Sequence, residues 1–503
     1  MTANLYALFK SHFPSDSFSP ALIERQGKIL TYGDLDSLSA RLAGVLIAEG
    51  ARPGDRIAVQ VEKSITAVAL YLACLRAGLV YLPLNTAYLS DELEYFIDDA
   101  KPAVVVGEAD SKSLPTIVKK HAVKAFLTLE VDGYGTLVSL AAEIEPFEEI
   151  YRNTQDDLAA ILYSSGTTGR PKGVMLSHGN LSSNAKTLHQ LWQFGPKDVL
   201  LHALPIFHTH GLFAALNTTL LNGTAILFHE KFVAEHVIED LRRATVFMGV
   251  PTYYVRLLAS KEFGREVCKG MRLFVSGSAP LPERTFNDFE KRTGHLILER
   301  YGMTEAGMIT SAHTDKPRRA GKVGWPLPDV KLRLNARNQE IEIKGPNVFS
   351  GYWGKPNETA ANFTSDKYFK TGDIGSFAKD GMISIIGRAK DMIISGGFNV
   401  YPKEVESCID EILGVDESAV VGMPHPDFGE AGLAIVTLKD GSANLTESKV
   451  IGALKNQLAN YKIPKAIVFV DSLPRNAMGK VQKALLRDRY KDLWFTKLES
   501  QNT

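Results

Sequence analysis

The chain has 503 residues, which is more than one hydrophobic core usually organises, so we expect at least two domains. With 45% hydrophobic and 23% charged residues, its composition is typical of a soluble globular protein. Lys and Arg together number 57, and Asp and Glu also number 57, so the net charge is zero. Nucleic-acid binding depends on an excess of cations, and this balance therefore argues against a nucleic-acid partner.

Several features predict a cytoplasmic location. The three cysteines lie far apart and match neither a disulfide framework nor a metal-binding spacing, as expected in a reducing compartment. The longest apolar stretch, residues 65–75, is too short to span a bilayer, so we expect no membrane partner. Lys10 and His12 interrupt the first residues before a secretory signal could form, and the final SQNT is not a peroxisomal signal.

Short β-like runs alternate with helical stretches through most of the first 390 residues. Clear examples of such runs are residues 56–62, 103–108, 224–228 and 272–277. Strands that alternate with amphipathic helices indicate α/β layers with largely parallel sheets. Near residue 330 the pattern changes to short strands, at 330–334, 340–345 and 382–387, which predict a small β-rich subdomain.

The last part of the chain has the pattern of a separate α+β unit. Its expected strands cover residues 418–424 and 433–438, and residues 450–462 are the expected helix. We place the boundary within residues 387–391, which gives domains 1–389 and 390–503. The predicted fold class is therefore α/β: a large N-terminal domain of layered αβα sheets with a small β-rich subdomain, a hinge, and a small α+β C-terminal domain.

Residues 163–173, YSSGTTGRPKG, follow the apolar run LAAIL. A strand that ends in a loop of Gly, Ser and Thr offers backbone N–H groups and hydroxyls that can surround phosphate oxygens, and Lys172 adds a positive charge. The loop is not a Walker P-loop, because Pro171 replaces the second glycine and Gly173 follows the lysine. The alternative is a surface turn rich in small residues.

The string resembles the phosphate loop of the adenylate-forming enzymes, which comprise acyl-CoA synthetases, peptide-synthetase adenylation domains and luciferases. Further motifs follow in that family's order from about residue 20 to about residue 490. They are TYGDL (31–35), GLVYLPLN (78–85), FHTHG (207–211), GSAPL (277–281), YGMTE (301–305), TGD (371–373), GRAKD (387–391), SGGFNVYPKEVE (395–406) and PRNAMGK (474–480). One departure is a shortened loop before residue 340, with Gln339 where glycine is common in the family.

The resemblance implies an enzyme that uses ATP and Mg²⁺ to convert a carboxylate into an acyl-AMP, from which coenzyme A displaces AMP. Such a reaction depends mainly on positioning and electrostatics. By resemblance, Thr167, Thr168, Gly169 and Lys172 grip the β- and γ-phosphates, and Ser164, Ser165 and Gly166 complete the loop.

The resemblance also assigns the rest of the nucleotide site. Glu305 would hold Mg²⁺, a cation that prefers oxygen ligands, together with Thr168, and Thr304 would contact the α-phosphate. The adenine and ribose contacts would come from Ser278, Ala279, Tyr301, Asp373 and Arg388. Taken as an isolated pair, Asp373 and Arg388 would more often be a surface salt bridge.

Lys480 is the expected catalytic residue of adenylation, because by resemblance it bridges the carboxylate and the α-phosphate. If it acts only in this half-reaction, the C-terminal domain must rotate about Lys390 before thiolation. Ser395, Gly396, Gly397 and Phe398 would then line the tunnel for the pantetheine arm of CoA.

Two arginines in the expected acyl pocket, Arg256 and Arg300, indicate which acid is activated. An arginine among apolar groups is costly unless an anion pairs with it, and a second substrate carboxylate would be that anion. Ser276 and His208 would complete the pocket, with His208 near the reacting carboxylate as a catalytic residue. Alternatively, Arg300 forms an internal salt bridge to Glu299 or Asp373, and Arg256 lies on an exposed helix face.

ERYGMTE, FHTHGL and MGVPTYYVR resemble the malonyl-CoA synthetases in particular. The leading hypothesis is thus an ATP-dependent malonate–CoA ligase of fatty acid metabolism that also accepts methylmalonate. The alternative is a CoA ligase for another short-chain or aryl acid. Amino-acid loading, a luciferase and a nucleotide sensor without activity are less favoured, the last because both Lys480 and Glu305 are present.

Overall fold

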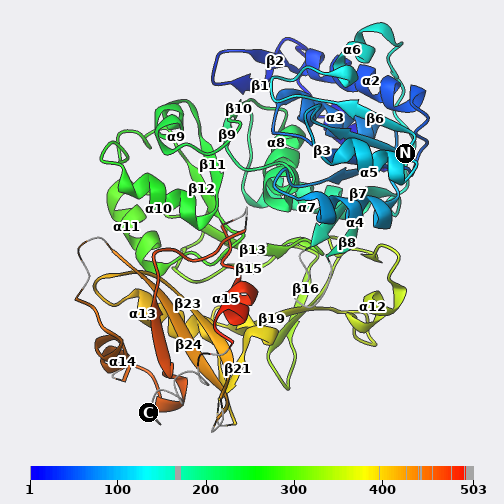
Figure 1. Ribbon diagram of the computed structural model, residues 1–503. Coiled ribbons are helices and arrows are strands. Elements are labelled where there is room, and N and C mark those ends of the chain that lie inside the picture. The colour runs from blue at the N-terminus through cyan, green and yellow to red at the C-terminus, as the bar shows by residue number, and fades with distance from the viewer. Residues whose placement is uncertain are drawn as a thin grey trace.

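The computed structural model describes residues 2–164, 171–395, 397–425, 428–439, 441, 444–455, 457–476, 479–491 and 493. Figure 1 shows a large part, coloured blue to green, above a smaller orange part that ends the chain. Helices cover sheets in the large part, and the small part has its own sheet and helices. The predicted α/β class, with a large N-terminal and a small C-terminal domain, is confirmed.

A seven-stranded sheet forms the first half of the large part. Its parallel strands are joined by helices, as the alternating pattern predicted, and one antiparallel pair, β7 with β8, flanks the phosphate loop. In sheet order β18-β8-β7-β4-β3-β5-β6, the strands are β18 (Gly351–Tyr352), β8 (Lys172–Ser177), β7 (Leu158–Ser164), β4 (Val80–Pro83), β3 (Arg56–Gln60), β5 (Val104–Gly107) and β6 (Ala125–Thr128). The helices of this region are α1 (Leu5–Lys10), α2 (Tyr32–Ala48), α3 (Ile65–Arg76), α4 (Ser90–Ala100), α5 (Leu114–Lys120), α6 (Thr136–Glu143) and α7 (His178–Leu191).

A nine-stranded sheet forms the second half, and one continuous hydrophobic core joins the two sheets. In sheet order the strands are β15 (Trp325–Pro326), β14 (Gly307–Ser311), β13 (Leu298–Met303), β12 (Leu273–Ser276), β11 (Val246–Gly249), β9 (Leu200–His202), β10 (Ile226–Phe228), β1 (Pro20–Glu24) and β2 (Ile29–Thr31). The helices here are the π-helix η1 (His210–Leu216), α8 (Asn217–Asn222), α9 (Ala234–Asp240), the 3₁₀-helix η2 (Leu241–Arg243), α10 (Pro251–Ala259) and α11 (Glu283–Thr293).

A four-stranded antiparallel sheet follows, as predicted for the β-rich subdomain. In sheet order it contains β16 (Lys331–Leu334), β17 (Glu340–Lys344), β19 (Phe369–Phe377) and β20 (Ile383–Arg388), and α12 (Pro356–Ala361) lies nearby in the chain. The shortened loop becomes a tight turn in which Gln339 takes a positive φ of 60° and donates its backbone N–H to Asn335.

The C-terminal sheet has five strands and hydrophobic clusters of its own, so this region has the anatomy of a domain. The strands are β21 (Ile393–Ser395), β22 (Phe398–Val400), β23 (Val415–His425), β24 (Gly429–Leu438) and β25 (Ala466–Phe469). The helices are the 3₁₀-helix η3 (Ala389–Asp391), α13 (Pro402–Asp410), α14 (Glu447–Lys455), the 3₁₀-helix η4 (Asn460–Lys462) and α15 (Lys483–Arg489). The helix predicted over residues 450–462 is too long: α14 ends at Lys455, and residues 460–462 form the separate 3₁₀-helix η4.

The apolar run predicted too short for a membrane is the core helix α3, in which all twelve residues are buried. Apolar residues on every side are typical of a helix in the interior of a large protein. No helix among the described residues is long and apolar enough to cross a membrane. At its end, Arg76 is fully buried and donates to Asp36, to the Tyr6 hydroxyl and to the Glu148 carbonyl.

Replacing Arg76 by alanine is expected to lower the free energy of unfolding by about 3 kcal/mol, because truncating one partner of a buried ion pair leaves polar groups unpaired. Lys10 pairs with the same Asp36 but its side chain is 40% exposed, so Lys10→Ala is the matched control, with an expected loss below about 1 kcal/mol. Chemical denaturation followed by tryptophan fluorescence measures both. Equal losses would contradict the assignment of Arg76 as the buried anchor.

Candidate functional site

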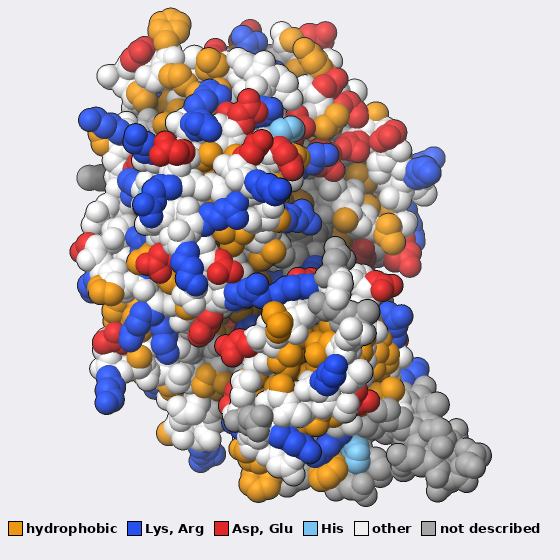
Figure 2. Space-filling model, turned by 90° about the vertical axis from the view of Figure 1, so that its left-hand side faces the viewer, with side chains coloured by type: hydrophobic (Ala, Val, Ile, Leu, Met, Phe, Trp, Pro, Cys, Tyr) orange, Lys and Arg blue, Asp and Glu red, His pale blue; other side chains and the backbone are white. Residues whose placement is uncertain are grey.

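The candidate site lies where ends of the large sheet, the β-rich subdomain and one loop of the C-terminal domain converge. Strand β13 carries Arg300 and Tyr301, β19 carries Asp373, and β20 ends at Arg388. Lys480 comes from the C-terminal domain, and its charge acts on the pKa values of groups in the N-terminal domain. Figure 2 shows a hollow between the upper and lower parts of the molecule, with Lys and Arg side chains along its rim.

Asp373 and Arg388, the expected ribose contacts, form an ion pair in which Asp373 is buried and Arg388 is partly exposed. Arg388 Nε lies 2.7 Å from Asp373 Oδ1, and the Tyr301 hydroxyl donates to Asp373 Oδ2 at 2.5 Å. Burial raises the pKa of Asp373, and the neighbouring Arg388 opposes this shift. Both carboxylate oxygens are thus oriented, although each keeps a lone pair for a further donor.

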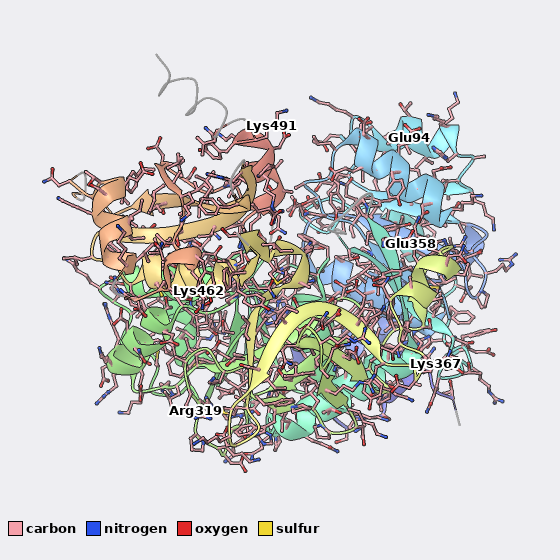
Figure 3. All side chains as sticks on the ribbon, turned by 90° about the horizontal axis from the view of Figure 1, so that it is seen from below. Glu94, Arg319, Glu358, Lys367, Lys462 and Lys491 are labelled. Atoms are coloured by element: carbon pink, nitrogen blue, oxygen red, sulfur yellow. The ribbon has the colours of Figure 1, made fainter. Side chains whose placement is uncertain are left out.

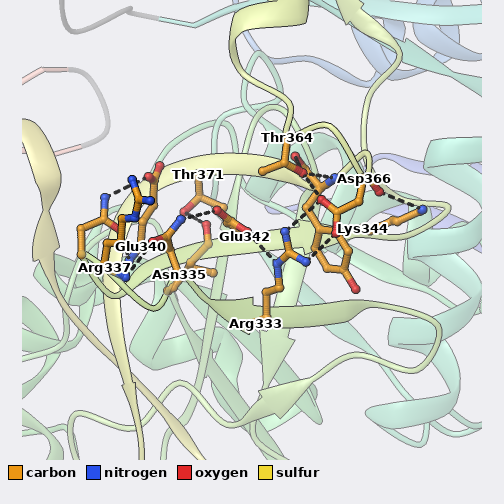
Figure 4. A network of polar contacts seen from close by, with 12 residues as sticks. Arg333, Asn335, Arg337, Glu340, Glu342, Lys344, Thr364, Asp366 and Thr371 are labelled. Carbon is orange, nitrogen blue, oxygen red and sulfur yellow. Dashed lines mark hydrogen bonds and ion pairs between the residues drawn. The ribbon is translucent and has the colours of Figure 1, made fainter.

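A polar network of the β-rich subdomain fixes the turn that carries Asp373 (Figure 4). Glu340 accepts the backbone N–H of Gly372 at 2.9 Å, and the Thr371 hydroxyl donates to the Ile341 carbonyl at 2.8 Å. The same hydroxyl oxygen accepts the backbone N–H of Asp373 at 3.1 Å. The turn is therefore held by β17 on one side and by its own threonine on the other.

Glu305 and Lys172, the expected metal and phosphate groups, meet at one tyrosine. Glu305 is only 8% exposed, burial raises its pKa, and it accepts the Tyr352 hydroxyl at 3.2 Å. The Lys172 ammonium lies 5.1 Å from the centre of the same ring and pairs with Glu358. The structure thus brings together two groups that lie 133 positions apart in the chain.

Some of the expected loop residues lie outside the described part of the chain. Ser164 is the last residue of β7 and pairs with Lys172 across the two strands. Outside the described residues lie Ser165, Gly166, Thr167, Thr168, Gly169 and, in the C-terminal domain, Gly396. The residues that are described contain no group of three or more His, Cys, Asp or Glu side chains that could hold a metal ion.

Arg300 is buried without a protein anion. Its side chain is 4% exposed, and neither Nε nor Nη2 has a hydrogen-bond partner among the described residues. Burial lowers the pKa of Arg300 to about 9. Both alternatives for an internal salt bridge are wrong: Glu299 accepts the backbone N–H of Gly321 at 2.9 Å, and Asp373 is paired with Arg388.

The surroundings of Arg300 are shaped to hold its guanidinium. A Cβ atom on Gly277 would lie 2.3 Å from Arg300 Cζ, so any other residue there would displace the guanidinium from its present position. The next residue, Ser278, has a φ of 74°, a conformation rare for residues other than glycine, and residues held in rare conformations cluster at functional sites. Ala279 follows it, half-buried, and Ser276 precedes the glycine, fully buried.

Three more buried polar atoms have no partner within the described residues: His210 Nε2, Thr209 Oγ1 and Ser276 Oγ. The His210 ring lies close enough to Arg300 for the charge of Arg300 to lower its pKa, whereas Ser276 pairs in register with Glu299 on the neighbouring strand. The Ser278 hydroxyl lies 3.2 Å from His210 Nδ1. Burial, and then the charge of Arg300, lower the pKa of His210 well below its usual value, so this imidazole is neutral. In the tautomer whose Nδ1 accepts from the Ser278 hydroxyl, the neutral ring carries its proton on Nε2, and the unpaired Nε2 is then a donor.

Sequence reasoning selected His208 from FHTHG and missed His210, two positions later in the same motif. The structure, and not the motif, draws attention to this position, because a Cβ on the following Gly211 would lie 2.0 Å from the Pro205 carbonyl oxygen. The π-helix η1 also begins at His210, and π-helical turns are frequent at functional sites. His208 lines a cavity of about 40 Å³ with Thr304 and, owing to burial and the charge of Lys480, has a pKa of about 4.

The prediction that Arg256 lies in an apolar pocket is wrong. Helix α10 buries Pro251, Tyr254 and Leu257, which share one face at a spacing of three residues. Arg256 is offset from this face and is exposed. The apolar neighbours of Arg256 in the sequence are therefore no guide to its surroundings in space.

The C-terminal domain presents Lys480 to the site, whereas two of its predicted tunnel residues, Gly397 and Phe398, lie in solvent. Burial, and then the charge of Arg388, lower the pKa of Lys480. A Cβ on the preceding Gly479 would lie 3.5 Å from Thr252 Oγ1, so this loop rests on the start of α10. Gly397 is exposed, and Phe398 is 57% exposed with its ring stacked on Tyr461 of the same domain.

Comparison with known proteins shows the family. The model of the family described as AMP-binding enzyme matches residues 15–353, and the model described as AMP-binding enzyme C-terminal domain matches residues 404–480. The chain therefore belongs to the AMP-binding enzymes. The adenylate-forming enzyme expected from the motifs is confirmed.

Three relatives illustrate the similarity. A malonate–CoA ligase of Arabidopsis thaliana is 33% identical over 97% of this chain and 89% of its own length. A feruloyl-CoA synthase of Amycolatopsis sp is also 33% identical, over 93% of this chain and 95% of its own. MatB of Rhodopseudomonas palustris is 48% identical over 98% of this chain and 100% of its own, with a TM-score of 0.95 for the ATP-bound structure and 0.83 for the apo structure.

Replacing Glu299, the buried neighbour of Arg300, by glutamine is expected to stabilise the protein at pH 8 but not at pH 5. Burial raises the pKa of Glu299 to about 8, so the folded state holds a proton that the unfolded chain releases near pH 4.3. The free energy of unfolding of the unsubstituted protein therefore falls as pH rises from the lower to the higher pKa, by about 1.4 kcal/mol for each pH unit.

Denaturation at the two pH values measures this effect. Glu290→Gln, on the exposed face of α11, is the control and should change stability by less than about 0.5 kcal/mol at both. A Glu299→Gln variant that is less stable at pH 8 would show that the carboxylate is ionised and paired.

Proposed function

We propose that this protein is an ATP-dependent malonate–CoA ligase that forms malonyl-AMP and then transfers the malonyl group to CoA. The observation that carries the proposal is the buried guanidinium of Arg300 without a protein anion. An uncompensated buried cation is costly, and a second carboxylate on the substrate would be its partner. The malonate–CoA ligases among the relatives support the same substrate.

Recognition of the distal carboxylate would use several donors at once. The free N–H groups of Arg300 and Nε2 of His210 are directional, and the Ser276 hydroxyl adds a third group. Each charge-assisted hydrogen bond contributes roughly 1.5–3 kcal/mol, so a single such bond already discriminates against a monocarboxylate by about tenfold or more. Methylmalonate keeps both carboxylates, and we propose it as a second substrate.

In the adenylation step, Lys480 would neutralise charge between the reacting carboxylate and the α-phosphate. His208 is neutral at pH 7, because its pKa is about 4, and can therefore act as a hydrogen-bond donor near that carboxylate without repelling Lys480. Tyr301 would present its ring to adenine, Asp373 would accept hydrogen bonds from the ribose hydroxyls, and Arg388 would support the same sugar. Ser278 and Ala279 would line the nucleotide beside them.

Mg²⁺ would be held by Glu305 and Thr168, and would neutralise triphosphate charge. The carboxylate of Glu305 fits this role, because a hard cation prefers oxygen and only one of its oxygens accepts a side-chain hydroxyl. Lys172 and the loop at residues 164–169 would hold the β- and γ-phosphates.

The second step would require the C-terminal domain, residues 390–503, to rotate on the N-terminal domain, residues 1–389, about Lys390. The lower TM-score with the apo form of MatB than with its ATP-bound form supports such a motion. Rotation would withdraw Lys480 and bring Ser395, Gly396, Gly397 and Phe398 to the site, where they would line the path of pantetheine. Phe398 is exposed to solvent, so its side chain is free to contact pantetheine after the rotation.

We further propose a cytoplasmic location and a role in supplying malonyl-CoA for fatty acid metabolism. All three cysteines are free, as expected in a reducing compartment. Malonate, ATP and CoA would be the small-molecule partners.

The direct test is CoA-dependent release of AMP from Mg·ATP with malonate, methylmalonate, acetate, butyrate, octanoate and 4-coumarate. We expect malonate to have the highest kcat/KM, with methylmalonate second. The feruloyl-CoA synthase among the relatives makes an aryl acid the main alternative. Preference for 4-coumarate or for an aliphatic monocarboxylate would agree with an acyl-CoA synthetase but would contradict malonate as its substrate.

Replacing Arg300 by glutamine should lower kcat/KM for malonate by roughly 100-fold or more, since two charge-assisted hydrogen bonds would be lost. Arg256→Gln is the matched control, because Arg256 is exposed on α10, and should leave malonate kinetics within about twofold. Steady-state kinetics measures both variants. An unchanged kcat/KM for malonate in the Arg300→Gln variant would contradict malonate as the proposed substrate.

Replacing Lys480 by alanine should slow formation of malonyl-AMP by roughly 100- to 1000-fold, because it removes a cation aimed at charge that develops in the transition state. Thiolation of supplied malonyl-AMP should be unaffected if the domain rotates as proposed. Rapid-quench measurement of each half-reaction separates the two. Equal losses in both steps would argue against the rotation.

A further inference from the structure

We propose that Tyr352 is a positioning residue for the metal and triphosphate end of the site, where its hydroxyl orients Glu305 and its ring supports Lys172. This inference rests on the proposed function, in which Glu305 holds Mg²⁺ and Lys172 holds phosphate. It goes beyond that function because it assigns a role to a residue outside the nucleotide motifs identified in the sequence.

The hydroxyl of Tyr352 lies 3.2 Å from Glu305 Oε1, and both side chains are buried. Glu305 forms no ion pair with any residue that the structure describes. The tyrosine is therefore the side chain that sets the direction of this carboxylate, and it engages one oxygen while the other can face a cation. A carboxylate that binds a metal is usually oriented by a hydrogen bond to one oxygen, and Tyr352 provides such a bond to Glu305.

The fold holds the tyrosine rigidly. Strand β18 pairs antiparallel with β8, so that Tyr352 lies opposite Val174, and the next backbone N–H, of Trp353, donates to the Gly173 carbonyl at 2.8 Å. The Tyr352 ring meets the Phe349 ring edge-on, with centroids 4.9 Å apart. Phe349 in turn donates its backbone N–H to the main-chain carbonyl of Glu305 at 2.8 Å, so the residue that packs on the Tyr352 ring also holds the backbone of Glu305.

The same ring lies beneath the cation that the phosphate loop presents. The Lys172 ammonium is 5.1 Å from the ring centroid and pairs with Glu358 on α12, which Figure 3 labels at the edge of the molecule. The side chains of this pair are 22% and 44% exposed, so the pair is weak and a triphosphate can displace Glu358. The aromatic face then keeps the ammonium in place during the exchange.

Tyr352→Phe removes the hydroxyl and keeps the ring, so it separates the two contacts. Glu305 then loses its orienting partner, whereas Lys172 retains the aromatic face. We expect affinity for a non-hydrolysable ATP analogue to fall about five- to tenfold with Mg²⁺ and to stay within twofold in EDTA. KM for Mg·ATP should rise more than kcat falls, and thiolation of supplied malonyl-AMP should be unchanged.

Calorimetric titration of the full-length protein with the analogue, with and without Mg²⁺, provides the readout independent of turnover. Tyr368→Phe is the matched control, because the Tyr368 ring also lies against a cation, Arg333, which has no proposed part in the site. Glu305→Gln is the reference variant and should lose the Mg²⁺-dependent part of the affinity. Thermal melting of each variant checks that it is folded.

The outcomes are distinct. Loss of Mg²⁺-dependent affinity in Tyr352→Phe, as in Glu305→Gln, supports the assignment. Loss in Glu305→Gln alone overturns the role of Tyr352 and leaves the proposed function intact. Retention in both variants overturns the metal role of Glu305, and with it this inference. A fall that is equal with Mg²⁺ and in EDTA also overturns the inference, because it reports damage to the nucleotide site as a whole.

Discussion

The burial of an unpaired guanidinium is the constraint on which the rest of the site depends. Arg300 is 4% exposed and has free N–H groups, yet it sits in a strand of a well-packed sheet. Burying an unpaired cation lowers the stability of the folded state, and the hydrophobic core that the two large sheets share offsets this loss. The strained Ser278 and the glycine at position 277 beside Arg300 belong to the same arrangement.

The charges of the site are balanced only in part by the protein. Arg388 is paired with Asp373, while the pKa of Lys480 is lowered by burial and by the charges of Arg388 and Arg300 and raised by those of Asp373 and Glu305. The neighbouring histidines are neutral, because burial lowers their pKa values. Such a site favours anionic ligands, and a triphosphate with a dicarboxylate would restore the balance.

Positioning in this protein is distributed over segments far apart in the chain. A turn of the β-rich subdomain orients Asp373, the short strand β18 orients Glu305 and Lys172, and a C-terminal loop resting on α10 delivers Lys480. The C-terminal domain has hydrophobic clusters of its own, which allows it to move as a unit without disturbing the other supports.

Local motifs and periodicity carried enough information to predict the family and the α/β layers, both of which are confirmed, and to propose the residues of the site. The sequence also predicted that Arg300 needs an anion, but only the tertiary structure excluded Glu299 and Asp373 as partners. The structure removed Arg256, since a helix turns neighbours in sequence to opposite faces. It added His210 and Tyr352, because burial and contacts between distant strands are not encoded in any short motif.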